Sequence, residues 1–353
     1  MPDGETVWRR VDELIDQAPG LGALRAHRIQ LLAGRRWREL GREIPDELRA
    51  EERLAALRDA IVPDLLARVR AATDRPVVLL KGPEIARRYP SPVLRQFIDL
   101  DLLAPDAEAL QRELLAAGFE QTENPVWAFR RPADADLFAD KHHLHPLRWE
   151  GWPMRLEIHR RPSWPTWLPE PPVTELLDAA QPAESDGVLT LPPGPHVLVL
   201  AAHLWVSNPF ARLRDVLDIS LLLRETDAAE VDALARAWGM SRLWETTQAV
   251  VRSVLLGGKS PLAERLWARH LAAAREQTVF EVHVTRWASP FWALPLRRAV
   301  PVAAASAAAD LAPAADEPWR AKARRSLRAL RNLGASKSKH EDELGPEGRQ
   351  LPR

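Results

Sequence analysis

The sequence predicts an α+β protein: a mixed sheet with flanking helices, a helical N-terminal lead-in and a helical C-terminal half. Apolar residues recur at helical spacing over residues 5–73 and again from residue 196. Between these segments, residues 76–160 carry short apolar runs of strand length. With 353 residues, 46% of them hydrophobic, the chain can bury a sizeable core, which excludes disorder of the whole protein.

The lead-in covers residues 1–75. Its helical period is clearest in five apolar residues spaced three or four apart: Leu54, Leu57, Ile61, Leu65 and Val69. Pro45 opens this segment, because proline is tolerated in the first turn of a helix. Pro63 is expected to kink or split the helix, since proline removes a backbone hydrogen bond.

The predicted mixed core covers residues 76–160. We expect strands at residues 77–80, 97–103, 126–130, 142–148 and 154–160. Gly82-Pro83 turns the chain after the first strand, and a short helix is expected at residues 84–89. Pro105-Asp106 starts a further helix, which ends at Gly118, a typical helix C-terminal residue.

Three more regions follow the core. Residues 161–195 are rich in proline and are read as a largely irregular connector with one short helix at 173–180. Residues 196–290 are predicted to form a helical domain, so that 1–160 and 196–290 make two lobes with a ligand between them. Residues 291–353 are an Ala/Pro-rich segment and a basic tail, whose helix after Pro318 is either a docking patch for membrane or RNA or a solvated terminal helix.

Composition excludes several classes of function. Lys+Arg and Asp+Glu both number 49, so the net charge is zero and nucleic acid is not expected as a partner. The absence of cysteine excludes disulfides, thiolate metal sites and a cysteine nucleophile, and fits a cytoplasmic protein. The charged N-terminus predicts no signal peptide, and prolines break the longest apolar tract, 299–315, so no transmembrane helix is expected. Six lysines against 43 arginines are typical of a high-GC bacterial genome.

A pair of carboxylates is the strongest chemical signal. Asp99 and Asp101 are two residues apart in an apolar strand, so both side chains leave the same face. At 4 Å and an effective dielectric of 20, two such charges repel by roughly 4 kcal/mol. The pair therefore lies in open water at a strand end or binds a cation, for which Mg²⁺ is the best fit.

The motifs around this pair resemble a known family. They are Leu79-Leu80-Lys81-Gly82, Tyr89-Pro90, Leu94-Arg95, Ile98-Asp99-Leu100-Asp101-Leu102-Leu103 and Ala117-Gly118-Phe119. This order is similar to that of an uncharacterised nucleotidyltransferase family in the superfamily that includes DNA polymerase β and the kanamycin nucleotidyltransferases. His142-His143, Leu156-Glu157-Ile158-His159, His203 and the segment 212–215 extend the resemblance over residues 76–225.

The resemblance implies a nucleotidyltransferase fold and an enzyme that uses Mg²⁺ or Mn²⁺. It would move NMP from an NTP such as ATP to a small-molecule or protein acceptor, with release of pyrophosphate. Asp99, Asp101 and Glu157 would hold the metals, and Lys81 and Gly82 would face the nucleotide phosphates. The chain departs from the pattern at Pro83, where these enzymes commonly have serine, so phosphate binding by that turn is in doubt. An inactive nucleotide- or partner-binding accessory protein on the same fold is the alternative.

The remaining candidates are an arginine, a third carboxylate and four histidines. Arg95 either contacts the triphosphate, braces the aspartates or lies at the surface. For the third carboxylate Glu157 is preferred to Glu150, because Glu150 lies in a turn, and antiparallel pairing of residues 154–160 beside the Asp99 strand would bring Glu157 close. The histidines line a pocket, bind a transition metal or lie on the strand surface: His143, His145, His159 and His203.

Overall fold

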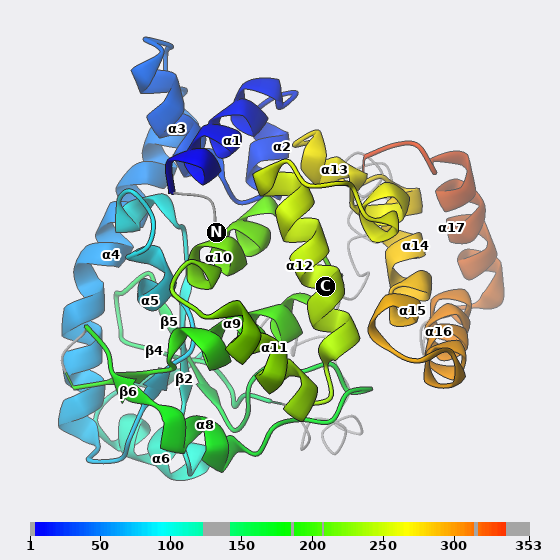
Figure 1. Cartoon of the computed structure of the whole chain (residues 1–353). Helices are drawn as coiled ribbons and strands as arrows, with labels where there is room; N and C mark the ends of the chain where they lie inside the picture. Colours follow the sequence, from blue (N-terminus) through cyan, green and yellow to red (C-terminus); the bar gives the residue numbers. More distant parts are fainter. Residues whose placement is uncertain (1–3, 123–141, 185–186, 207, 314–316, 337–353) are drawn as a thin grey trace.

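A computed structural model describes residues 4–122, 142–184, 187–206, 208–313 and 317–336 (Figure 1). The lead-in forms four helices: α1 (Gly4–Gln17), α2 (Leu21–Ala26), α3 (Gln30–Glu39) and α4 (Asp46–Ala72). Helix α4 follows Pro45 as predicted, but Pro63 does not split it. Val62 and Leu65, on either side of the proline, are both buried against the sheet, and this packing outweighs the missing hydrogen bond.

The sheet is mixed, as predicted. Within the described residues it has seven strands in the order β3-β4-β5-β2-β1-β7-β6. The strands are β1 (Val78–Leu79), β2 (Asp99–Leu103), β3 (Glu120–Gln121), β4 (Leu147–Arg148), β5 (Arg155–His159), β6 (Gln181–Pro182) and β7 (Leu189–Thr190). The strand expected at 126–130 lies outside the described residues.

Short helices connect the strands. Gly82 precedes α5 (Pro83–Ala86), and a 3₁₀ turn, η1 (Pro92–Leu94), leads to β2. The predicted helix after Pro105 is α6 (Ala107–Ala116), where the Asp106 side chain accepts a hydrogen bond from the Ala109 N–H. Gly118 follows α6 with a φ of 101°, a conformation that favours glycine.

The proline-rich connector is more ordered than predicted. It contains the expected helix, α8 (Val173–Ala179), but also β6 and β7. Strand β7 pairs in parallel with β1, at the centre of the mixed core. The sequence did not predict β6 and β7, because two-residue strands carry no sequence period and their order comes from backbone pairing with each other and with β1.

The C-terminal half is helical. It consists of α9 (Pro193–Leu204), α10 (Leu213–Leu223), α11 (Ala228–Ala237), α12 (Ser241–Leu256), a π-helical turn η4 (Glu264–Ala268), α13 (Arg269–Ala272), α14 (Val279–Ala288), α15 (Pro290–Ala293), α16 (Leu296–Leu311) and α17 (Trp319–Arg331). Figure 1 places α14 to α17 beyond α12, at the side away from the sheet. In the part of the chain that the structure describes, no helix combines the length and the apolar character needed to cross a membrane.

The two faces of the sheet pack against different helices. Leu100 and Leu102 of β2 share a hydrophobic cluster with α4 and α6. Leu80 and Leu103 belong to a second cluster, which includes residues of α1, α9 and α10. Because side chains alternate along a strand, the odd-numbered residues of β2 face the helical half. The division into five regions stays a prediction.

Candidate functional site

Two parallel strands bring the predicted carboxylates together. Strands β2 and β5 pair in register, with Asp101 opposite Glu157 and Asp99 opposite Arg155. The expectation that β5 lies beside β2 is confirmed, but the expected antiparallel orientation is wrong. The chain reverses twice, from β3 to β4 and from β4 to β5, and this returns β5 in the direction of β2. The register still places Glu157 on the face that carries Asp101, as the alternation predicts.

Asp101 lies at the centre of the cluster and is buried. Its Oδ1 accepts hydrogen bonds from Lys81 Nζ at 3.0 Å and from His159 Nε2 at 2.9 Å. Burial alone would raise the pKa of Asp101, but the charge of Lys81 and the hydrogen bond of His159 hold this pKa well below its usual value. Asp101 is therefore ionised, and no described residue donates to its Oδ2.

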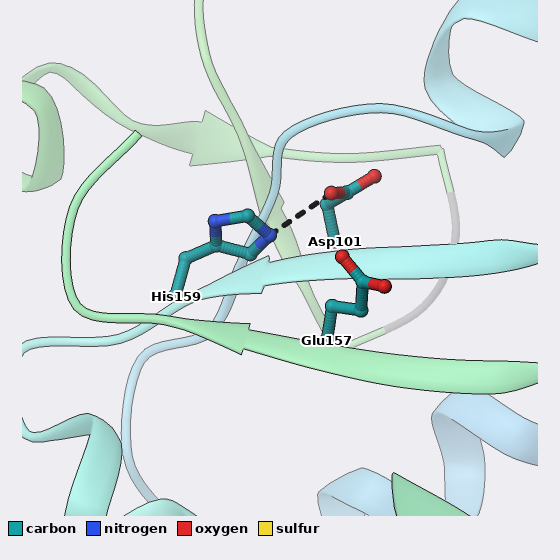
Figure 2. A group of neighbouring side chains, drawn as sticks. All are labelled: Asp101, Glu157 and His159. Atoms are coloured by element: carbon teal, nitrogen blue, oxygen red, sulfur yellow. Dashed lines mark hydrogen bonds and ion pairs between the residues drawn. The ribbon is translucent and has the colours of Figure 1, made fainter. Parts of the chain in front are cut away.

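The pKa of Glu157 is shifted in the opposite direction to that of Asp101. Burial, and then the negative charges of Asp101 and Asp99, raise the pKa of Glu157 to about 7. Figure 2 shows Asp101 and Glu157 projecting toward the same side from neighbouring strands, with His159 beside Asp101. Ligand atoms of Asp101, Glu157 and His159 all lie within 4.8 Å of one another, which is close enough to share one metal ion.

The donor chemistry of this group fits a hard divalent cation. Carboxylate oxygens are the ligands that Mg²⁺ prefers, and Mn²⁺ also accepts imidazole. A cation would offset the burial and the repulsion by Asp101 and Asp99 that together raise the pKa of Glu157 to about 7. His159 donates from Nε2 to the Asp101 carboxylate, so in this arrangement His159 orients Asp101.

The turn after β1 lies against the aspartates. Gly82 has a φ of 75°, and a Cβ there would meet the Leu100 side chain at 3.4 Å and the Asp99 carbonyl oxygen at 3.6 Å. These distances are ordinary van der Waals contacts, so it is the positive φ that favours glycine at this turn. Pro83 follows as the first residue of α5 and offers neither an N–H nor a hydroxyl to a phosphate. The Lys81 ammonium is already paired with Asp101.

Arg95 is buried and joins the Gly82 turn to the helical half. Its guanidinium donates to both carboxylate oxygens of Asp218 on α10, at 2.9 and 2.7 Å, and to the Gly82 carbonyl at 3.4 Å. The Tyr89 hydroxyl donates to the same Asp218 at 2.7 Å. Arg95 also lines a cavity, but its guanidinium is engaged by Asp218 and the Gly82 carbonyl, so its role is to hold the Gly82 turn against α10.

A cavity of about 460 Å³ lies between the sheet and the helices. One wall, which we call the acidic wall, consists of Asp99, Asp101 and Glu157. A second group of lining residues, which we call the basic wall, consists of Arg25, Arg28, Arg212 and Arg214 with Asp215. Lys81, Gly82 and Arg95 also line the cavity. A volume of this size falls in the range of small-molecule and cofactor sites.

The four predicted histidines separate into two groups. His203 lines the cavity, where the charge of Lys81 and then burial lower its pKa to about 3, so that its ring is neutral. His159 binds Asp101. His143 packs against His159, with ring centroids 5.5 Å apart, and His145 offers its carbonyl to Gln111, but neither lines the cavity.

Sequence reasoning missed the basic wall. No sequence pattern marks Arg28, and Arg212, Arg214 and Asp215 enter the sequence analysis only as part of the segment 212–215 of the family resemblance. In a chain with 43 arginines, no local pattern distinguishes those that face a cavity. Arg25 lies in α2 and Arg28 in the turn after it, whereas Arg212, Arg214 and Asp215 come from the start of α10, so only the tertiary fold brings them together.

Comparison with known proteins gives one match. The model of a family described as "Uncharacterised nucleotidyltransferase" matches residues 15–255, more than half of the chain. The match covers both walls of the cavity. No curated protein and no solved structure matches the chain.

Proposed function

The chain belongs to this family of uncharacterised nucleotidyltransferases, and from that premise we propose that it transfers NMP from an NTP to a small-molecule or protein acceptor and releases pyrophosphate. The observation that carries the proposal is the in-register pairing of Asp101 with Glu157, which puts three carboxylates with Asp99 on one wall of a cavity. Such a cluster is suited to divalent metal ions in phosphoryl-group chemistry.

Asp99, Asp101 and Glu157 would hold Mg²⁺ or Mn²⁺. A bound ion would polarise the reacting phosphoryl group and neutralise charge on the leaving pyrophosphate. Lys81 and His159 keep Asp101 ionised and oriented, which leaves its Oδ2 directed to a ligand. Burial and the two aspartates raise the pKa of Glu157 to about 7, so a bound ion would keep this carboxylate ionised, and an oxygen not engaged by the ion would accept a proton from an acceptor hydroxyl or amine.

A binding protein without transferase activity is the second candidate, and Pro83 favours it. The Gly82-Pro83 turn lacks both donors that a phosphate would use there, and Lys81 is engaged by Asp101. The three carboxylates favour the enzyme, because the repulsion between their charges destabilises the folded protein unless a cation is bound.

Pyrophosphate release separates the two candidates. The protein is incubated with each of the four NTPs and with Mg²⁺ or Mn²⁺, using itself and a cell extract as sources of acceptor, and pyrophosphate is measured. The enzyme requires metal-dependent release that Asp101→Asn abolishes. Metal-dependent NTP binding without any release would support the binding protein instead.

A further inference from the structure

The basic wall carries positive charge that the protein itself does not balance. Arg214 pairs with Asp215 at 2.9 Å, and Arg25 pairs with Glu51 and Glu47. The guanidinium groups of Arg28 and Arg212 form no hydrogen bond or ion pair with any residue that the structure describes. Both side chains are half-buried and line the cavity. Arginines held in this way call for an anion from outside the chain.

The electrostatics of this wall agree with that requirement. Burial, and then the charges of Arg214 and Arg212, lower the pKa of Arg28 to about 10. For Asp215, burial acts in the opposite direction to Arg214 and Arg212, but the arginines prevail and hold the pKa of this carboxylate well below its usual value. The wall is therefore a region of positive potential despite the zero net charge of the chain.

Arg28 occupies a backbone conformation that favours glycine. Its φ is 56°, directly after α2, where its N–H donates to the Arg25 carbonyl at 3.0 Å. Glycine or asparagine adopts this region more easily at a helix C-terminus. The chain has an arginine here, and that arginine lines the cavity. Such strained residues cluster at ligand-binding positions.

His27 fixes the position of this strained turn. Its Nδ1 accepts from the Leu213 N–H at 3.2 Å, and its Nε2 donates to the Arg275 carbonyl at 2.8 Å. The His27 carbonyl accepts from the Arg214 N–H at 3.2 Å. The bonds with Leu213 and Arg214 tie the turn after α2 to the start of α10, and the bond to Arg275 ties it to the segment after α13. Arg28 and Arg212 are thereby held on one wall before any ligand arrives.

We propose that Arg28, Arg212 and Arg214 form a clamp for the triphosphate chain of the nucleotide, in the same cavity as the carboxylates that would hold the metal. The inference rests on the proposed function and assigns the phosphate-binding residues of that site. Pro83 offers a phosphate neither an N–H nor a hydroxyl, and Lys81 is paired with Asp101. Among the described cationic side chains that line the cavity, Arg28 and Arg212 are those without a partner.

The acidic and basic walls are close enough to act on one ligand. The negative charge of Asp99 raises the pKa of Arg28, against the larger effects of burial and neighbouring arginines, so the two groups interact electrostatically within the cavity. A nucleotide whose phosphates contact the arginines would then have its reacting phosphorus directed toward Asp99 and Asp101. A phosphorylated acceptor would offer the same chemistry, and the experiment distinguishes the two.

The test uses inorganic tripolyphosphate in EDTA, titrated calorimetrically into the full chain at low salt. Arg28→Gly removes the guanidinium and relieves the positive φ, so this variant should unfold at the same temperature as the wild type or a higher one. Arg212→Ala is the second variant. The matched control is Arg236→Ala, which removes an exposed arginine of α11 far from the cavity lining.

The clamp predicts that the wild type binds tripolyphosphate and that each cavity variant binds it at least about tenfold more weakly, since each loses a charge-assisted contact. ATP affinity with Mg²⁺ should fall in the same variants, and the control should match the wild type. Equal tripolyphosphate binding in all four proteins, or none in the wild type, would overturn the clamp. So would unchanged ATP affinity with a raised KM for a phosphorylated acceptor. Because the tripolyphosphate arm involves no transfer, a missing pyrophosphate release would refute the proposed function without deciding this one.

Discussion

The acidic and basic walls of the cavity are built in different ways. The acidic wall comes from two adjacent strands, where one register fixes Asp101 beside Glu157. The basic wall comes from the turn after α2 and the start of α10, which the His27–Leu213 hydrogen bond joins across 186 residues of sequence. A strand motif therefore places the groups proposed to bind metal, whereas tertiary packing places the groups proposed to bind phosphate.

Because the two walls are built differently, substitutions in them should affect activity and stability to different extents. Substitutions in the acidic wall remove the groups proposed to bind metal, so their largest effect should be on activity. Substitutions that disturb the junction of α10 with the turn after α2 and with the Gly82 turn should destabilise the fold, because buried contacts hold it together. The predictions that follow set these two behaviours against each other.

The largest effect is expected at the two aspartates. Asp99→Asn and Asp101→Asn should each abolish nucleotidyl transfer. The melting temperature should stay close to that of the wild type in Asp99→Asn, which removes a repelling charge, and should fall in Asp101→Asn, which removes the buried charge that pairs with Lys81. Pyrophosphate release and thermal unfolding, measured on the same preparations, check both halves. An active Asp101→Asn protein would exclude a metal-binding role for this residue.

Breaking the junction between α10 and the Gly82 turn should lower the free energy of unfolding. Asp218→Ala leaves the buried Arg95 guanidinium without its partner, and breaking such a pair costs about 3–5 kcal/mol of unfolding free energy. Glu120→Gln, which breaks the exposed pair with Arg148, should change it by less than about 1 kcal/mol. Urea titrations measure both variants. Similar small losses in the two would show that Arg95 does not brace the Gly82 turn.

Substitution of Glu157 should affect turnover but not nucleotide binding. Glu157→Gln should lower turnover by at least about two orders of magnitude, a typical loss for a positioned acid-base group. NTP affinity should stay nearly intact, because Asp99 and Asp101 remain. Glu150→Gln, in an exposed turn, is the control and should be close to wild type. Equal turnover in the two variants would show that Glu157 has no part in catalysis and that the site contains only the two aspartates.

Acid should destabilise the fold through its buried histidines. Burial lowers the pKa of His27 and of His196 to about 4, and that of His270 to about 3. The unfolded chain binds these protons below about pH 6.5 and the folded chain does not, so stability is complete above that pH and falls as the pH drops. By pH 5 each histidine should cost about 2 kcal/mol of unfolding free energy.

Urea unfolding at pH 7.5 and pH 5 measures this loss. His196→Gln keeps a donor for the Leu80 carbonyl but cannot take up a proton, so the variant should lose less stability between the two pH values than the wild type. Identical losses in the two proteins would mean that His196 is not held neutral by the fold.

Local patterns in the sequence predicted the acidic wall because strand alternation is a local property. Asp99, Asp101 and Glu157 each lie between apolar residues, and this alone assigns their face. The direction of β5 was not predictable in the same way. It depends on the intervening reversals, and β3, a pair of exposed polar residues at Glu120–Gln121, has no apolar signal.

Tertiary contacts determine what the sequence left open. Strands β6 and β7 contain two residues each, in a proline-rich segment, and form only because β7 pairs with β1. The burial of Arg95 depends on Asp218, which is distant in sequence. Arg28 adopts a positive φ, and no neighbouring residue type predicts this backbone conformation.

Calorimetric titration of ATP into the wild-type protein, with and without Mg²⁺, tests most directly whether the acidic wall is a metal-dependent nucleotide site. We predict that Mg²⁺ or Mn²⁺ strengthens ATP binding at least about tenfold over EDTA, because the ion joins the three carboxylates to the phosphates. The gain should disappear in Asp101→Asn. Equal ATP affinity with metal and in EDTA would contradict the account.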